Sequence, residues 1–460
     1  MRTTAKTRSK KSPAIVEMHP QVAGIDIGSR DHWVAGPPGA SGEPNVRSFG
    51  TTTADLVELV RWLKAQRITS AAMESTSVYW IPLYELLESH GIEPVLVDTK
   101  HVHNVPGRAK TDCLDCQWLQ LLHSRGLLRA AFRPGKDIAR IRTLQRQLSN
   151  FVEERTRCVQ WMQKALDQMN VQVHHAVTDL TGKTGMTIVR AIVAGERDPL
   201  RLATHRDPRC RKSVVEIANH LTGTWRDEHL FNLAASLRLY DSLEHMIADY
   251  EAHITRELEA LHPPERRDRE PSPNPNRAKE RSLKAQGTLE LRTNLWRFAG
   301  ADLTRIDAIG ADAAQRILTE VGTDLSMFPT EHHFVSWVRL APRTAFSGGR
   351  RLRSRRNGLG ATRIANVLRM AAASLHHSKT ALGAAYRRIA RKKGAGVAVF
   401  AMARRLAELV YRMLRYGQDY VDLGEQAYER RFETMRVASL TATARELGYT
   451  LVKQDPTVAA

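Results

Sequence analysis

Strand and helix patterns alternate between residues 21 and 134, and this alternation constrains the fold more than any other feature of the sequence. Short runs rich in apolar and β-branched residues, typical of strands, are separated by runs whose apolar residues recur at helical spacing. The predicted strands cover residues 22–27, 32–35, 46–49, 68–73 and 93–97. The predicted helices begin at Thr53, near Tyr84 and within residues 110–120. Such an alternation indicates an α/β domain built around a mixed sheet.

Four carboxylates lie at the ends of these predicted elements. Asp26 belongs to the first strand, Glu74 directly follows the strand at 68–73, and Asp112 and Asp115 begin the helix in KTDCLDCQWLQ. Residues three apart share a helix face, so both aspartates could contact one cation. Alternatively, Asp112 is an N-cap and Asp115 an acid in the first turn, where the helix dipole favours negative charge. The residues alone leave both interpretations open.

The charge balance predicts a polyanionic partner. The chain has 460 residues, with 69 Lys and Arg against 49 Asp and Glu, a net charge of +20 and a pI near 10.1. Basic side chains that bind phosphates release condensed counterions, which makes nucleic acid the leading candidate. An acidic membrane surface is the less favoured alternative, because no apolar run reaches about 18 residues. The basic N-terminus lacks the apolar region of a signal peptide, so we expect a cytoplasmic protein.

The four cysteines do not indicate a disulfide framework or a zinc site. They are too few to staple a chain of this length, so reduced thiols are expected. Cys113 and Cys116 have the spacing of a zinc-binding or redox pair, but no second pair is present at the required spacing. We expect these two cysteines to pack within a helix.

Two long helices are predicted after residue 135. Apolar residues recur at heptad spacing over residues 136–173 and again over 230–261, with Arg155 interrupting the first series. The first series is Ile141, Leu144, Leu148, Phe151, Cys158, Met162, Ala165 and Met169. The second is Leu233, Leu237, Tyr240, Ile247, Ile254 and Leu258. We expect the two arms of an antiparallel coiled coil.

The segment between these two helices contains an incomplete phosphate-loop motif, and the segment after the second helix has the composition of a linker. TGKT at 181–184 resembles part of a phosphate loop, but position 177, where that loop requires Gly, is Val. We therefore reject a nucleoside triphosphate site there. Residues 262–288 are proline-rich and charged, which predicts a solvated linker.

A second candidate for chemistry lies beyond the linker. Residues 303–321 predict two helices joined by a turn at Ile309 and Gly310, which could either bind a phosphate or serve only as a turn. Ser347 then lies in LAPRTAFSGGRRLRSRR, where two glycines follow it and arginines surround it. Arginine forks bind phosphate and can stabilise developing charge, so this serine is placed to attack a phosphodiester. The six arginines are Arg343, Arg350, Arg351, Arg353, Arg355 and Arg356, all predicted to bind nucleic acid.

The order of these motifs resembles that of the DEDD transposases of the IS110 insertion-sequence family, which are bridge-RNA-guided serine recombinases. The likeness covers residues 22–133 through GIDIG, MEST-x-x-Y and KTD-x-x-D. It also covers residues 303–420 through the I-G turn, LAPR-x-x-x-SG and the closing helices. Two departures stand out: the turn reads D-A-I-G where the family often has P-G-I-G, and residues 173–286 are much longer than in compact members.

The resemblance implies a RuvC-like N-terminal domain with a ribonuclease H fold. Its acidic tetrad would be Asp26, Glu74, Asp112 and Asp115, binding Mg²⁺ or Mn²⁺, with Ser347 as the nucleophile. Implied partners are donor and target DNA, a structured non-coding guide RNA, and further copies of the chain in a dimer or tetramer. A nucleoid-associated location follows, without membrane attachment.

The expected organisation follows from these patterns together. It comprises a mobile basic arm (1–20), the RuvC-like domain (21–134), the coiled-coil region with its insertion (135–261), the linker (262–288), a helical transposase domain with the catalytic serine (289–425) and a tail (426–460). The implied reaction is RNA-guided DNA cleavage and strand exchange through a covalent phosphoserine. The alternative is a RuvC-like metal-dependent nuclease that uses water as nucleophile.

Overall fold

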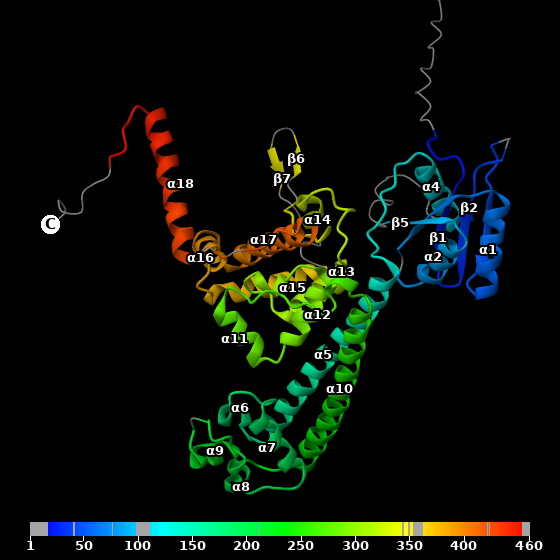
Figure 1. Ribbon diagram of the computed structural model, residues 1–460. Coiled ribbons are helices and arrows are strands. Elements are labelled where there is room, and N and C mark those ends of the chain that lie inside the picture. Colours follow the sequence, from blue (N-terminus) through cyan, green and yellow to red (C-terminus); the bar gives the residue numbers. More distant parts are fainter. Residues whose placement is uncertain are drawn as a thin grey trace, which may run out of the picture. The chain divides into compact units, whose positions relative to one another are not determined.

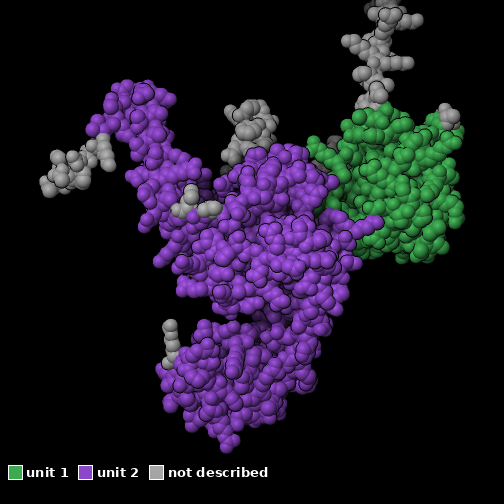
Figure 2. Space-filling view, viewed as in Figure 1, with its two compact units in different colours: residues 1–133 green, residues 134–460 purple. Residues whose placement is uncertain are grey.

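A computed structural model describes most of the chain. The described residues are 17–39, 42–75, 77–97, 111–210, 212–342, 345–347, 350–352, 362–420, 422 and 424–452. Two compact units divide the chain, Met1–Arg133 and Pro134–Ala460 (Figure 2). Most of the predicted basic arm and the last eight residues lie outside the described part.

Unit 1 contains a five-stranded sheet in the order β3-β2-β1-β4-β5. Its strands are β1 (Val22–Ile27), β2 (Asp31–Ala35), β3 (Val46–Gly50), β4 (Ser70–Glu74) and β5 (Glu93–Val97). Strand β1 pairs antiparallel with β2 but parallel with β4, which in turn pairs parallel with β5. The predicted mixed α/β sheet is therefore confirmed.

Three described helices cover this sheet (Figure 1). They are α1 (Thr53–Ala65), α2 (Trp80–Ser89) and α4 (Asp112–Ser124). Ile25 and Met73 point to the face that packs on apolar residues of α1 and α2, including Leu59 and Leu83. Side chains alternate along a strand, so Gly24 and Ala72 point to the opposite face, against which α4 packs.

Unit 2 begins with a pair of long antiparallel helices, α5 (Lys136–Gln168) and α10 (Asp227–Ala260) (Figure 1). Arg155 donates to Glu244 at 2.6 Å, and the rings of Phe151 and Tyr250 lie 5.3 Å apart. All of the predicted seam residues are buried except Leu144 and Phe151, which are half-buried. Arg155, which interrupts the seam, is thus paired with an acid on the facing helix. The helices form a packed pair, and the coiled-coil interpretation stays a prediction.

The insertion between these helices folds into a helical cap. It contains α6 (Val173–Ala176), α7 (Lys183–Val193), α8 (Pro199–Thr204) and α9 (Val214–Leu221). Ile188, Leu202 and Ile217 are fully buried in one apolar cluster with Met162 and Leu233 from the long helices. The TGKT segment follows helix α6 and a turn, whereas a phosphate loop follows a strand.

In the rest of unit 2, the described residues are helical apart from one short hairpin. Its helices are α11 (Arg277–Ala285), α12 (Leu289–Ala299), α13 (Ala311–Val321), α14 (Glu331–Trp337), α15 (Arg363–Ser374), α16 (Ala381–Lys393), α17 (Ala395–Tyr416) and α18 (Glu425–Glu446). Single 3-10 turns occur at Pro264–Arg266, Leu303–Arg305 and Leu375–His377. The hairpin is β6 (Ala345–Ser347) with β7 (Arg350–Leu352). Arg146 of α5 binds Glu320 of α13 through two 2.8 Å bonds, which ties the long helices to this region.

Residues 262–288 differ from the solvated linker that their composition predicts. Helix α11 lies within them, and Leu283 and Asn274 are buried. Asn274 donates to the Thr304 carbonyl, and the Ser272 carbonyl accepts from the buried Arg292. Polar contacts hold this segment to unit 2, so its low apolar content does not leave it free in solvent.

The turn at Asp307–Gly310 is held by a buried polar network. The Tyr420 hydroxyl donates to Asp307 at 3.0 Å, and the Lys279 ammonium donates to the Ile306 carbonyl. Burial lowers the pKa of Lys279 to about 8. Ala308 has φ of +69°, in the left-handed region that suits glycine.

We expect Ala308→Gly to stabilise the protein. Removing the strained Cβ should raise the free energy of unfolding by about 1 kcal/mol, a rise in Tm of roughly 2 °C by calorimetry. Ala313→Gly, inside helix α13, is the control and should lower stability by about the same amount. A lower Tm for Ala308→Gly would show that the turn does not carry this strain.

Candidate active site

Two of the predicted acids lie on neighbouring parallel strands. The register pairs Ile25 of β1 with Met73 of β4, which places Asp26 beside Glu74 at the carboxyl ends of these strands. Both point to the face that α4 covers, because each lies two residues after a small residue on that face. Glu74 is buried and Asp26 is half-buried.

Helix α4 carries the other two acids in its first turn. Thr111 is its N-cap, and the threonine hydroxyl accepts from the Leu114 amide at 3.3 Å. The interpretation of Asp112 as the N-cap is therefore wrong, because the preceding threonine takes that position. Asp112 is exposed and Asp115 is half-buried, and both benefit from the positive end of the helix dipole.

Gly24 lets α4 approach the sheet until backbone meets backbone. A Cβ atom at this position would lie 2.2 Å from the Gln120 nitrogen and 2.3 Å from the Cys116 carbonyl oxygen. The Cys116 thiol also lies near enough to Asp26 to feel its charge. Cys116 precedes Gln120 in α4 and is the one of the two that lies near Asp26. The amino end of α4 is therefore directed toward Asp26. The contact therefore brings Asp112 and Asp115 toward the edge that holds Asp26 and Glu74.

Cys113 and Cys116 pack within α4. The Cys116 thiol donates to the Cys113 carbonyl at 3.1 Å. Burial, followed by the charges of Cys113 and Asp26, raises the pKa of Cys116 to about 12. The thiol is therefore neutral at physiological pH.

The chemistry of the acidic residues suits a hard divalent cation. All four donors are carboxylates, and Mg²⁺ and Mn²⁺ prefer oxygen ligands. Among the described residues, no three His, Cys, Asp or Glu side chains are already arranged to hold a metal ion. The four carboxylates are thus suitable ligands for such an ion and are directed to one edge of the sheet. They are not close enough together to coordinate one ion as they stand.

Ser347 lies in unit 2, in the β6–β7 hairpin. It is the last residue of β6 and pairs with Arg350, the first residue of β7, so the two flank the turn. Arg351 follows in β7, whereas Arg343, Arg353, Arg355 and Arg356 lie outside the described residues. Thr362 donates to the Val338 carbonyl at 2.8 Å, so the segment carrying the hairpin starts and ends at one point of unit 2.

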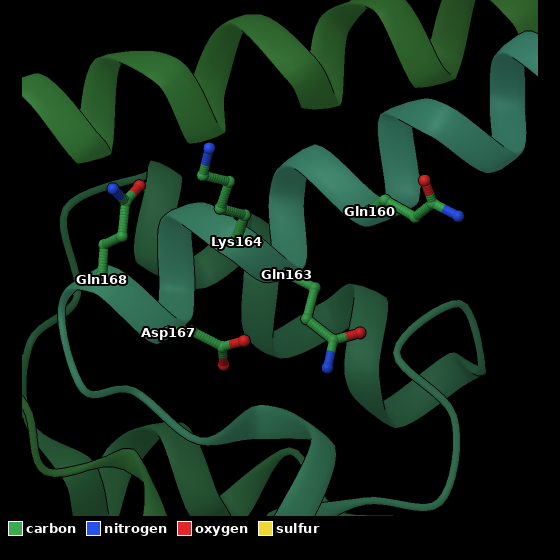
Figure 3. Close-up of a pocket in the computed structure, with 5 residues that line it drawn as sticks. All are labelled: Gln160, Gln163, Lys164, Asp167 and Gln168. Carbon is green, nitrogen blue, oxygen red and sulfur yellow. The ribbon is translucent and has the colours of Figure 1, made fainter.

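Cavities in unit 2 lie away from these residues in the chain. The pocket in Figure 3, about 420 Å³ in volume, is lined by the α5 side chains Gln160, Gln163, Lys164, Asp167 and Gln168. A larger cavity of about 820 Å³ in the cap has Lys183, Arg209 and Lys212 on its wall. No predicted catalytic residue lines either cavity.

Sequence reasoning missed two features of the site. Gly24 was not singled out, although a glycine inside a predicted strand can indicate a close backbone approach. Tyr79, the last residue of MEST-x-x-Y, was not assigned a role, yet it is exposed beside the strand that ends at Glu74.

Gly24→Ala tests whether α4 depends on this close approach. We expect a loss of about 2 to 3 kcal/mol in the free energy of unfolding, because backbone atoms on α4 must move to admit the methyl group. Gly39→Ala is the matched control, since its Cβ would meet nothing closer than 3.8 Å. Equal urea midpoints for the two variants would rule out a tight packing requirement at Gly24.

Comparisons with known proteins match two regions of the chain. Residues 23–171 match the family model of IS110 DEDD transposases, described as a transposase. Residues 300–387 match the model described as the transposase IS116/IS110/IS902 family. The two ranges together cover just over half of the chain, the first containing the four acids and the second containing Ser347. No curated protein matches the sequence. No helix in the described part of the chain is long and apolar enough to span a membrane.

Proposed function

Because the chain belongs to the IS110 family of DEDD transposases, which cleave and join DNA, we propose that its reaction passes through a covalent phosphoserine at Ser347. The serine oxygen loses its proton and bonds to phosphorus, while the bond from phosphorus to a deoxyribose oxygen breaks and that oxygen leaves as a hydroxyl. Attack by a second DNA strand reverses this step and frees the serine. One phosphodiester is thereby exchanged for another, so the reaction needs no external energy source.

The observation that supports the metal-assisted half of this proposal most strongly is the contact between α4 and β1. It directs Asp112 and Asp115 toward the sheet edge of Asp26 and Glu74, which gives a DNA-cleaving enzyme four carboxylates in one region. These residues would hold a divalent cation, Mg²⁺ or Mn²⁺, which when bound supplies charge neutralisation at a phosphate. Without it, the carboxylates would repel the DNA backbone.

The arginines near Ser347 are proposed to bind the DNA phosphates, whereas the carboxylates would bind the cation. Arg343 and Arg350 are nearest to the serine in sequence, so they are proposed to contact the reacting phosphate and stabilise its added negative charge. Arg351, Arg353, Arg355 and Arg356 would follow the neighbouring phosphates. A net charge of +20 also suits a structured guide RNA that pairs with donor and target DNA. A nucleoid-associated location would follow from that binding.

Ser347→Ala and Asp26→Asn test the two halves of this mechanism. We expect Ser347→Ala to abolish protein–DNA adducts that survive denaturation, because the nucleophile is lost. Asp26→Asn should reduce the rate of adduct formation by at least about 100-fold while folding is retained. Denaturing gels after incubation with a labelled insertion-sequence end measure both.

The control is Ser336→Ala, an exposed serine of the same unit, which should form adducts normally. DNA cleavage by the parent protein without any adduct would instead favour the nuclease that uses water.

The oligomer implied by the family is proposed to form through the outward face of the α5–α10 pair. Trp161 and Leu239 are 47% and 44% exposed and line a groove of about 430 Å³ between these helices. The buried seam residues Leu148 and Leu237 are used within the chain, so a charge there would disrupt its own fold. A second copy packing on Trp161 and Leu239 would remove their apolar surface from water.

Trp161→Glu combined with Leu239→Glu should therefore shift the protein to a smaller species in light scattering, with its helical content unchanged. Leu200→Glu is the control, because Leu200 is also exposed, at 56%, but lies on α8 in the cap. An unchanged mass for the double variant would contradict assembly through this face.

A further inference from the structure

The described residues between β4 and α2 make hydrogen bonds beside Glu74. The Ser75 amide donates to the Val97 carbonyl at 3.2 Å, which fixes the start of the loop to β5. The Trp80 indole donates to the Ser77 carbonyl at 3.1 Å, which fixes its end. Ser77 has φ of +51°, a conformation that costs energy for a residue with a side chain. Ser75 and Ser77 are thus held by hydrogen bonds, and Ser77 is strained.

This anchoring presents two apolar side chains to solvent. Val78 is 62% exposed and Tyr79 is 46% exposed, whereas the adjacent Trp80 is half-buried. Trp80 packs edge-on against Tyr84 at 5.6 Å, and the Arg133 guanidinium lies 3.9 Å over the Tyr84 ring. The fold therefore partly covers Trp80, the first residue of α2, and leaves Tyr79 exposed.

The position of Val78 and Tyr79 beside the sheet indicates which kind of ligand would cover them. Parallel strands bind ligands at their carboxyl edge, and the loop leaves β4 at that edge, next to Glu74 and Asp26. The bases next to a DNA phosphate bound at this edge can be contacted on their faces only where the duplex is opened. An unpaired base has a flat apolar face that an exposed tyrosine ring can stack on, whatever its sequence.

We propose that Tyr79, supported by Val78, stacks on an unpaired nucleobase next to the phosphate that the enzyme cuts. This inference rests on the proposed function, since it requires DNA at the acidic edge. Tyr79 acts as a binding and positioning residue, and it takes no part in the bond exchange. Because stacking involves no phosphate contact, its contribution to affinity is independent of salt, unlike that of an arginine.

The test uses a single-stranded oligonucleotide that contains 2-aminopurine, a base whose fluorescence falls when it stacks. It is added to full-length protein carrying Ser347→Ala, so that no cleavage interferes. Tyr79→Ala should weaken binding roughly 10-fold and abolish the fluorescence change, with an unchanged dependence of affinity on salt. Tyr79→Phe should keep both, because the ring is retained. Tyr449→Ala, at a tyrosine that is 73% exposed elsewhere in the chain, should have no effect.

The possible outcomes separate the stacking proposal from the phosphoserine mechanism. Full affinity and full quenching in Tyr79→Ala overturn the stacking proposal, as does a loss in Tyr79→Phe equal to that in Tyr79→Ala. Neither result depends on adduct formation, which is measured separately with Ser347 intact. If the protein that retains Tyr79 gives no quenching but forms adducts normally when Ser347 is intact, only the stacking inference is contradicted. If quenching depends on Tyr79 but no adduct forms with Ser347 intact, only the phosphoserine is contradicted.

Discussion

The close approach of α4 to β1 at Gly24 is the contact on which the candidate site depends. One hydrogen atom of Gly24 occupies the position where any other residue would place a Cβ within 2.3 Å of the helix backbone. The approach is therefore fixed by backbone atoms, which cannot rotate away as a side chain can. It sets the position of the first turn of α4, and with it the positions of Asp112 and Asp115 relative to Asp26.

Gathering carboxylates at one edge has an electrostatic cost, since like charges that approach one another raise the free energy of the folded state. The amino end of α4 reduces this cost, because its unpaired amides and dipole favour the negative charges in its first turn. A bound cation would reduce it further, so metal binding and the stability of unit 1 should be linked. Thr111, by capping the helix, leaves Asp112 free of that task and available to face a ligand.

The spacing of apolar residues predicted the strands and helices correctly, whereas amino-acid composition did not predict which segments are buried. The strands of unit 1 and the seam of α5 and α10 follow from apolar spacing, because those residues pack on a face with a fixed repeat. Composition failed at residues 262–288, since Asn274 and the carbonyl of Ser272 are satisfied by partners distant in sequence. The same limit applies to Gly24: a glycine in a strand can indicate a close neighbour, but only the tertiary structure identifies that neighbour as α4.

The basic charge of the chain is divided between folding and the proposed binding role. Arg292 is buried against Asp302, whereas the partly exposed Arg146 and Arg412 pair with Glu320 and Glu331. Each of these arginines is neutralised by a partner within unit 2, so it adds little to the field that DNA meets. Residues 340–356, in contrast, contain six arginines and no acid. The positive charge around Ser347 is therefore not compensated within its own segment, and a phosphate is the partner that would compensate it.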